Sequence, residues 1–276
     1  MFEHVLVDVE AGVATITLNR PERLNAIDHG PGSMHHELAE AVRLLGEDDA
    51  ARCIVVRGAG RGFSSGGYLP PGAVDAATAS DFHGFLSTED AHNEVLRESR
   101  KPIFAAVHGI CYGAALMMAL HLDFIVASRS ARFGLIETRF GSTGAETLLY
   151  FVGPQWAKFL ALSGELIGAP RAADIGLILE AVPDEQFDER VADLARRMAA
   201  MPTPATIFNR ALLNGALEGL GWSHQKQLAR ALNAITNASD AVAADGRTFH
   251  QIRQEGGMDA FKEARDAPFE EPWLQD

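Results

Sequence analysis

The 276-residue sequence has few cysteines and few basic residues, and both shortages narrow the classes of protein that it can be. Its two cysteines, Cys53 and Cys111, cannot build a disulfide framework, so we expect a reducing, cytoplasmic location. Lysine and arginine total 24 against 37 acidic residues, which gives a formal net charge of -13. Because nucleic acids and anionic membranes are bound through basic surfaces, we expect neither as a partner.

Long apolar runs are also missing, although residues 103–120 come close to one. A membrane-spanning helix needs about 20 uninterrupted apolar residues. Here His108 and Gly109 interrupt the run, and Asp123 follows it. We therefore expect a buried strand at 103–107, a glycine turn and a buried helix. The N-terminus has neither a basic region nor a long apolar one, so no signal peptide is predicted.

Short β-rich runs alternate with helical segments over the first two thirds of the chain. Residues 4–9 and 13–18 are typical of a hairpin, and residues 34–45 carry apolar side chains at helical spacing. From residue 184 onward the pattern is almost wholly helical. This order predicts an α/β fold. We expect a catalytic core over residues 1–200 and a helical region over 201–276 that serves for association or as a lid.

Three glycine-containing segments, at 62–69, 108–116 and 132–137, are the first candidates for a site. Small residues at strand ends let a backbone N–H approach a ligand without obstruction. A helix that begins near Gly113 would present unpaired N–H groups with partial positive charge. Two such donors directed at one oxygen atom form an oxyanion hole. Each segment taken alone is more typical of a plain turn than of a site.

Several stretches match, in chain order, the motifs of one known family: Asn19–Ala26 (NRPERLNA), Phe63–Gly67 (FSSGG), Lys101–Gly109 (KPIFAAVHG), Phe133–Gly141 (FGLIETRFG), Ser163–Pro183 and Phe261–Phe269 (FKEARDAPF). Through these motifs, which cover nearly the whole chain, the sequence resembles the enoyl-CoA hydratase/isomerase (crotonase) family. The resemblance implies a spiral of ββα units with C-terminal helices that pack into a homotrimer or hexamer. It also implies an acyl-CoA thioester as substrate.

The resemblance further implies the roles of individual residues. The backbone N–H groups of Gly67 and Ala114 would form the oxyanion hole, and Glu137 would act as general acid and base. Coenzyme A would enter only as part of the thioester, with no permanently bound cofactor. No spacing of His, Cys and acidic residues predicts a metal site. The other residues expected to contact the thioester are Arg23, Ala26, Ser65, Gly66, Tyr68, Leu69 and Gly113.

The sequence also departs from the family pattern. Met117 stands where the family hydratases carry the first of two catalytic glutamates, whereas Glu137 matches the second. Tyr68 replaces a frequent aspartate, and Arg265 and Lys262 are candidate contacts for the coenzyme A phosphates. The chain after Glu137 is about four residues shorter than the family motif, so Glu146 could lie near the pocket. Its alternative reading is an exposed carboxylate in the first turn of a helix.

A single carboxylate beside an oxyanion hole can take a proton from one carbon and return it to another, which is isomerase chemistry. We therefore expect isomerisation or hydration of an enoyl-CoA, with hydration slowed by Met117. Two alternatives remain. Another acyl-CoA reaction, namely hydrolysis, decarboxylation or C–C cleavage, would use His83, Asp90, His92 or Glu146. A non-catalytic acyl-CoA-binding protein would keep the fold alone.

Overall fold

The computed structural model describes residues 2–28, 30–68, 78–239, 241–271 and 273–274. Its centre is a six-stranded sheet in which β1 runs antiparallel to β2 and all other neighbours are parallel. The strands, in spatial order, are β1 (Val5–Glu10), β2 (Val13–Leu18), β3 (Cys53–Gly58), β4 (Ile103–Val107), β6 (Ile125–Ser128) and β9 (Glu180–Val182). The β1–β2 pair is the hairpin that the sequence predicts.

Strand β3 shows how the sheet buries both of its faces. Ile54 and Val56 lie in the main hydrophobic core, whereas Cys53 and Val55 lie in a second core on the opposite face, with residues of α7 (Phe187–Ala199). A parallel strand buried on both faces appears in the sequence as a continuous apolar run. The main core also receives residues from α1 (Met34–Glu47) and Leu96 of α2 (Ala79–Arg97).

A second, smaller sheet leads into the segments that carry Ala114 and Glu137. It consists of β5 (Ile110–Tyr112), β7 (Arg132–Gly134) and β8 (Ile167–Gly168). The prediction for residues 103–120 is thereby corrected. After the turn at Gly109, where φ is +60°, the chain forms strand β5 before it enters α3 (Ala114–Ala119). No described helix is long and apolar enough to cross a membrane.

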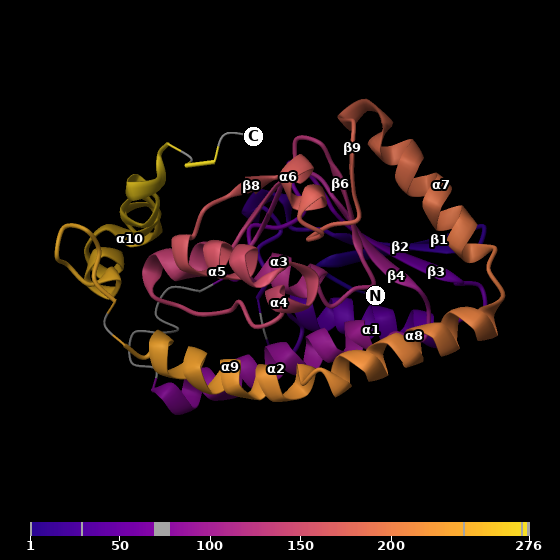
Figure 1. Ribbon diagram of the computed structural model, residues 1–276, viewed down its shortest axis with the longest axis horizontal. Coiled ribbons are helices and arrows are strands. Elements are labelled where there is room, and N and C mark those ends of the chain that lie inside the picture. The colour runs from indigo at the N-terminus through magenta and orange to yellow at the C-terminus, as the bar shows by residue number, and fades with distance from the viewer. Residues whose placement is uncertain (1, 29, 69–77, 240, 272, 275–276) are drawn as a thin grey trace.

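The last third of the chain is helical, as the sequence predicts. Helices α8 (Thr203–Gly219) and α9 (Trp222–Asn237) follow one another along the lower edge in Figure 1, and α9 lies beside α2. Helix α10 (Phe249–Asp266) lies at the side of the molecule. The remaining elements are the 3-10 helices η1 (Pro21–Arg23), η2 (Ile136–Phe140), η3 (Asp184–Gln186) and η4 (Ala267–Phe269), and the helices α4 (Leu148–Phe151), α5 (Pro154–Ser163) and α6 (Ala169–Asp174).

Candidate active site

The loop over residues 63–68 is held in place by one buried amide side chain. Asn25 is fully buried, and its backbone has a positive φ of +51°. Its Oδ1 accepts a hydrogen bond from the N–H of Arg20 at 2.8 Å. Its Nδ2 donates to three carbonyl oxygens, those of Ala59, Gly62 and Phe63, at 2.8, 3.0 and 3.1 Å. Asn25 therefore fixes where the loop leaves strand β3.

The end of this loop presents Gly67 beside Ala114. The N–H of Ile27 donates to the Gly66 carbonyl at 2.8 Å, and the N–H of Tyr68 donates to the Ile27 carbonyl at 2.6 Å. Neither bond uses the N–H of Gly67. A Cβ placed on Gly67 would lie 3.7 Å from the Cβ of Ala114. The structure thus brings together the two residues that the sequence proposes as oxyanion donors.

The N–H of Ala114, at the start of α3, is directed at a carboxylate. It donates to Oε1 of Glu137 at 2.7 Å. Gly113, just before it, has a φ of +55°, and a Cβ at this position would overlap the Glu137 carboxyl group. Only glycine therefore allows α3 and Glu137 to come this close.

Glu137 has the surroundings of a perturbed carboxylate. It belongs to η2, and its Oε2 is buried and has no hydrogen-bond partner among the described residues. Burial raises the pKa of Glu137, and the charge of Glu146 acts in the same direction. The hydrogen bond from Ala114 and the charge of Arg265 offset only part of this effect. A carboxyl group whose pKa is raised above its ordinary value is better suited both to accept and to return a proton.

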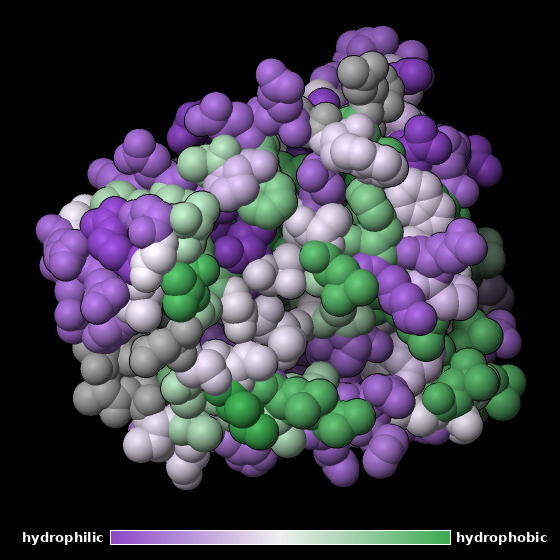
Figure 2. Space-filling model, turned by 60° about the vertical axis from the view of Figure 1, so that its left-hand side comes forward, coloured by the Kyte–Doolittle hydropathy of each residue, from purple (hydrophilic) through white to green (hydrophobic). Residues whose placement is uncertain are grey.

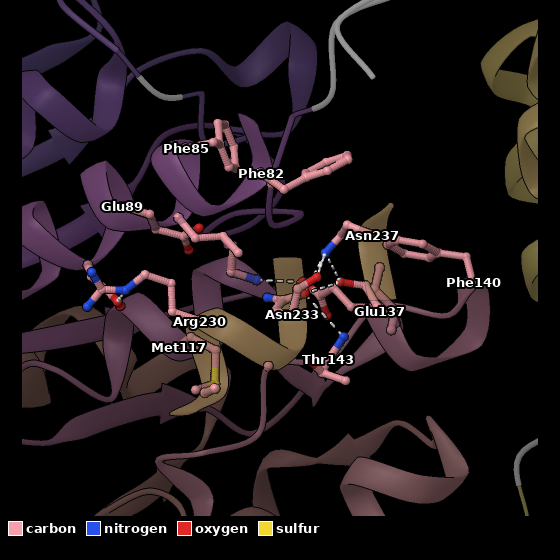
Figure 3. Close-up of a pocket in the computed structure, with 18 of the residues that line it drawn as sticks. Phe82, Phe85, Glu89, Met117, Glu137, Phe140, Thr143, Arg230, Asn233 and Asn237 are labelled. Atoms are coloured by element: carbon pink, nitrogen blue, oxygen red, sulfur yellow. Dashed lines mark hydrogen bonds and ion pairs between the residues drawn. The ribbon is translucent and has the colours of Figure 1, made fainter. Parts of the chain in front are cut away.

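These groups open onto one cavity with largely apolar walls. Figure 3 shows Phe82 and Phe85 projecting into it from α2, and Glu137, Thr143 and Asn233 on the other side. The apolar side chains that line it are Phe82, Phe85, Leu86, Met117, Ile136, Phe140, Ala229, Met258 and Phe261. They come from α2, α3, η2, α9 and α10, so the cavity closes only when the C-terminal helices fold over the core. Such walls suit the acyl part of a ligand.

Three more carboxyl groups line the cavity, those of Glu146, Glu89 and Asp90. Glu146, whose position the sequence leaves open, lies in the cavity wall, where burial raises its pKa. Glu89 was missed by the sequence analysis. Burial raises its pKa to about 8, assisted by the negative charges of Asp90, Glu146 and Glu137. The sequence could have indicated it, because positions 82, 85, 86 and 89 have the spacing of one helix face, and the first three are apolar.

Comparison with known proteins identifies the family. The family model described as enoyl-CoA hydratase/isomerase matches residues 8–272. The chain belongs to the enoyl-CoA hydratase/isomerase family. The chain is 38% identical to the 1,2-epoxyphenylacetyl-CoA isomerase of Escherichia coli K12, over 74% of this chain and 79% of that protein. It is 28% identical to the crotonyl-CoA hydratase of Syntrophomonas wolfei, over 97% of this chain and 98% of that protein.

Solved structures of the family share the fold. An enoyl-CoA hydratase/isomerase from Xanthobacter autotrophicus Py2 aligns with a TM-score of 0.88 at 30% identity, covering 98% of this chain and all of that chain. An enoyl-CoA hydratase from Mycobacterium smegmatis aligns with a TM-score of 0.86 at 27% identity, covering 96% and 94%. The predicted α/β fold of the crotonase type, with a helical C-terminal region, is therefore confirmed.

In this member of the enoyl-CoA hydratase/isomerase family, the position of the first family glutamate is apolar. Met117 lines the cavity, and its sulfur accepts a hydrogen bond from Oγ1 of the buried Thr147 at 3.6 Å. A thioether is a weak acceptor and carries no proton. Met117 cannot take over the proton transfer of a carboxylate.

Of the three residues on α2 that the sequence offers for other acyl-CoA reactions, Asp90 alone is among the described residues that line the cavity. Asp90 forms ion pairs with Lys226 at 3.1 Å and Arg230 at 2.9 Å. His83 is exposed. His92 packs against the rings of two other histidines, and burial lowers its pKa. Neither histidine is placed to move a proton in the cavity.

Lys226 balances the charges at this end of the cavity. Its Nζ lies 3.0 Å from Oε1 of Glu94 and 2.9 Å from Nε2 of His121, in addition to its contact with Asp90. Nδ1 of His121 lies 2.7 Å from the Met117 carbonyl, to which it must donate, so Nε2 is the acceptor for Lys226. Burial and then the charge of Lys226 lower the pKa of His121, which stays neutral.

The remaining expected binding residues lie around the loop at 63–68. Ser65, Gly67 and Tyr68 line the cavity. Arg23 is exposed, with its guanidinium 5.2 Å from the centre of the Tyr68 ring. Ala26, Gly66 and Gly113 lie in the backbone segments behind them and are not among the described cavity-lining residues, and Leu69 lies outside the described residues. Arg265, at the end of α10, also lines the cavity.

Proposed function

We propose that this enzyme binds an acyl-CoA thioester with its carbonyl oxygen between the N–H groups of Gly67 and Ala114. The observation that carries this proposal is the 2.7 Å hydrogen bond from the Ala114 N–H to a carboxylate oxygen of Glu137. A backbone donor at a helix start that holds one anionic oxygen is suited to hold another. The thioester oxygen would take the place of Oε1, and Glu137 would then face the carbon chain.

The chemistry follows from the two parts of this site. Hydrogen bonds to the carbonyl oxygen make the α-carbon more acidic and stabilise the enolate. From a 3-enoyl-CoA, Glu137 takes the α-proton, the electron pair of the broken C–H bond enters the conjugated enolate, and the resulting acid returns the proton at the γ-carbon to give the 2-enoyl-CoA. The product is the isomer with the double bond moved by one position. The name of the relative from Escherichia coli, an isomerase, agrees with this reaction class.

Hydration of an enoyl-CoA is the second candidate. Glu146 lies in the cavity wall with a pKa raised by burial, so it is a second acid or base that water addition would need. The relative named crotonyl-CoA hydratase supports this reading. We expect hydration to be the slower reaction, because Met117 cannot hold or activate water. Hydrolysis, decarboxylation and C–C cleavage receive less support, because Asp90 is held by two cations.

Coenzyme A enters this scheme only as part of the substrate, and no permanently bound cofactor is needed. Arg23 is exposed beside the loop at 63–68, and Arg265, near the end of α10, lines the cavity and is partly exposed. Both are placed to contact the phosphates of the coenzyme A moiety. The two cysteines are free and buried, which suits a cytoplasmic enzyme.

We further propose that the enzyme assembles as a homotrimer or hexamer through the helical region at 201–276. Figure 2 shows hydrophobic side chains along the lower edge of the molecule, where α8 and α9 run. Phe208 and Leu212 on α8 are 66% and 72% exposed, and Leu228, Leu232 and Ile235 follow one face of α9. Apolar stripes of this kind mark association surfaces. Sedimentation analysis would show three or six chains per particle, and a monomer would contradict the assembly.

The reaction is tested with 2-enoyl- and 3-enoyl-CoA thioesters in deuterated water, with products followed by mass spectrometry and NMR. Deuterium at the α- or γ-carbon without water addition is the result expected for isomerisation. Glu137→Gln should lose this exchange, whereas Glu185→Gln, an exposed change in η3, should keep it. Full turnover by Glu137→Gln would remove Glu137 from its proposed role. Rapid formation of a 3-hydroxyacyl-CoA would favour hydration instead.

A further inference from the structure

Asn233 places an amide side chain in the part of the cavity wall that α9 forms. It lines the cavity on the side that also carries Glu137 and Thr143 in Figure 3. An amide in a largely apolar wall loses water, and a hydrogen bond must replace that water if the cost is to be offset. The partners of its oxygen and nitrogen atoms therefore bear on which ligand the cavity binds.

The oxygen atom of the Asn233 amide is engaged within the protein. Oδ1 accepts hydrogen bonds from Oγ of Ser142 at 2.9 Å, from the N–H of Thr143 at 3.4 Å and from Nδ2 of Asn237. Figure 3 shows the bonds from Thr143 and Asn237 meeting at Asn233. A backbone N–H can only donate, so the bond from Thr143 identifies this atom as the amide oxygen rather than the nitrogen. The orientation of the amide is therefore fixed.

The nitrogen atom is the other branch of the same planar amide. No described residue accepts a hydrogen bond from Nδ2 of Asn233. This atom is not sealed inside the protein, because the buried side-chain atoms without a partner among the described residues belong to His92, His108 and Glu137. Its two N–H groups are therefore available to a group that enters the cavity.

Two hydrogen bonds tie this amide to the carboxylate that we propose as the acid and base. The N–H of Ser142 donates to the backbone carbonyl of Glu137 at 3.0 Å, and Oγ of Ser142 donates to Oδ1 of Asn233 at 2.9 Å. In the proposed reaction Glu137 acts on the α- and γ-carbons. The Asn233 amide therefore lies beside the part of the acyl chain at these carbons or just beyond them.

The chemistry of an amide nitrogen narrows the group that it can hold. Nδ2 donates hydrogen bonds, accepts none and carries no charge, so it needs an acceptor on the ligand. A chain of carbon and hydrogen alone offers no acceptor. A carboxylate on the acyl group would stand near Glu137 and Glu146, whose negative charges would oppose it. The acceptor that fits is an uncharged oxygen, such as that of an ether, a hydroxyl group or a ketone.

We propose that Asn233 selects acyl groups that carry an uncharged oxygen at positions 3 to 5 of the chain, by donating a hydrogen bond from Nδ2 to that oxygen. This inference rests on the proposed acyl-CoA function and narrows its substrate class. A hydrocarbon chain would displace water from Nδ2 without replacing the hydrogen bond. The three bonds to Oδ1 hold the amide in place before the ligand arrives, so little ordering is needed on binding.

The test compares three saturated thioesters of one length and similar shape. They are hexanoyl-CoA and its two analogues in which an ether oxygen replaces the methylene group at position 3 or position 5. Saturated chains have no double bond to move or hydrate, so calorimetry measures binding alone. For at least one ether, the affinity relative to hexanoyl-CoA should be about 10-fold higher in the wild type than in a variant without the donor. Comparing these ratios cancels the different hydration of ether and methylene groups in water.

Two variants remove the donor in different ways. Asn233→Asp keeps the oxygen that Ser142 and Thr143 contact, and hydrogen bonds to that oxygen favour the ionised aspartate, which cannot donate. Asn233→Leu removes both polar atoms without adding a charge, and it should bind hexanoyl-CoA at least as tightly as the wild type. Both variants should lose the preference for the ether. Gln155→Glu, the same change of amide to carboxylate at an exposed site on α5, is the matched control and should keep it.

The outcomes separate this inference from the function on which it rests. Equal ratios in the wild type and both Asn233 variants would overturn the role of Asn233 and leave the acyl-CoA function standing. Equal weakening of all three thioesters in the variants would do the same, because Asn233 would then hold a water molecule or only the loop at 142–143. Failure of every thioester to bind the wild type would overturn both proposals.

Two measurements on the wild type do not depend on the variants. An amide does not titrate, so the preference should be the same at about pH 6 and about pH 8.5. Its disappearance over this range would assign the donor to a carboxyl group and contradict the proposal. A crystal structure with the preferred ether should place its oxygen about 3 Å from Nδ2 of Asn233. An ether oxygen bonded elsewhere would also contradict it.

Discussion

The two ends of the cavity are built by different means. At one end, backbone geometry places Gly67, Gly113 and Ala114 close together, with the carboxylate of Glu137 against the start of α3. At the other end, Glu89 and Lys226 stand within a network of charged side chains contributed by α2 and α9. At the first end, the close approach of backbone segments leaves no room for a side chain at Gly113. At the second end, the positions of the side chains depend on ion pairs between them. We therefore expect substitutions at Gly113 to be poorly tolerated, and substitutions at the charged end to be tolerated where they preserve the charge.

The largest effect on stability should come from removing the balancing charge. Lys226→Met leaves Asp90 and Glu94 near each other without their shared cation, and Lys226 is almost fully buried. Breaking a buried ion network by removing one partner costs about 3–5 kcal/mol. Urea unfolding should show this loss, and Lys158→Met, an exposed change on α5, should show almost none. Similar stability for both variants would mean that Arg230 and solvent compensate for the charge.

A comparable effect, on activity, should come from one methyl group at the backbone-built end. In Gly113→Ala the added Cβ would overlap the Glu137 carboxyl group, and the residue would keep a φ of +55°, which disfavours side chains. Displacing an oxyanion donor costs about 100-fold in kcat. Gly84→Ala is the control, because a Cβ on this helical glycine meets nothing within 4 Å. An active Gly113→Ala enzyme would show that Glu137 does not need its position against α3.

A smaller effect should appear in how stability depends on pH. Between about pH 4.5 and 8, the unfolded chain has an ionised Glu89 while the folded protein keeps it protonated. The unfolded state then binds fewer protons, so stability falls as pH rises through this window and levels off above it. Glu89→Gln removes this contribution. The variant should gain about 2 kcal/mol on the wild type between pH 5 and 8, below the limit of about 1.4 kcal/mol per pH unit.

The measurement is the free energy of unfolding of both proteins at several pH values under otherwise equal conditions. Their difference isolates Glu89, because the other carboxyl groups whose pKa is raised, Asp123, Glu137 and Glu146, are present in both. Parallel curves for wild type and variant would contradict the raised pKa.

The same contrast explains what the sequence predicts and what it leaves out. The motifs around Gly67, Gly113 and Glu137 are local, since each depends on a few neighbouring residues and a required backbone shape. The family resemblance carried by these motifs therefore points to Gly67, Ala114 and Glu137, and the structure places these three residues next to one another; their roles as oxyanion donors and base remain a proposal. It also predicts the strands at 13–18 and 103–107, whose apolar patterns follow directly from burial.

The charged end depends on which helices pack against each other, and no local pattern contains that information. Glu89 meets Glu146 only because α2, α9 and the loop before α4 close around one cavity. Strand β5 was missed for a similar reason, since a three-residue strand is defined by its partner β7 rather than by its own composition. At Glu89 and at strand β5, the sequence alone does not show which distant segment packs against the residues in question.

The smallest expected effect concerns Met117, which lines the cavity. Met117→Glu would restore the carboxylate that the family hydratases carry at this position, with Oγ1 of Thr147 near enough to bond it. We expect about a 10-fold gain in water addition to a 2-enoyl-CoA, a difference of about 1.4 kcal/mol in the barrier, without a gain in proton exchange. Met117→Gln, of the same shape but unable to accept a proton at neutral pH, is the matched control. A gain in both variants would mean that polarity alone admits the water. A gain in neither would mean that the negative charges around the cavity, those of Asp90, Glu137 and Glu146, keep the added carboxyl group protonated, so that the charged end helps to decide which chemistry the backbone-built end can perform.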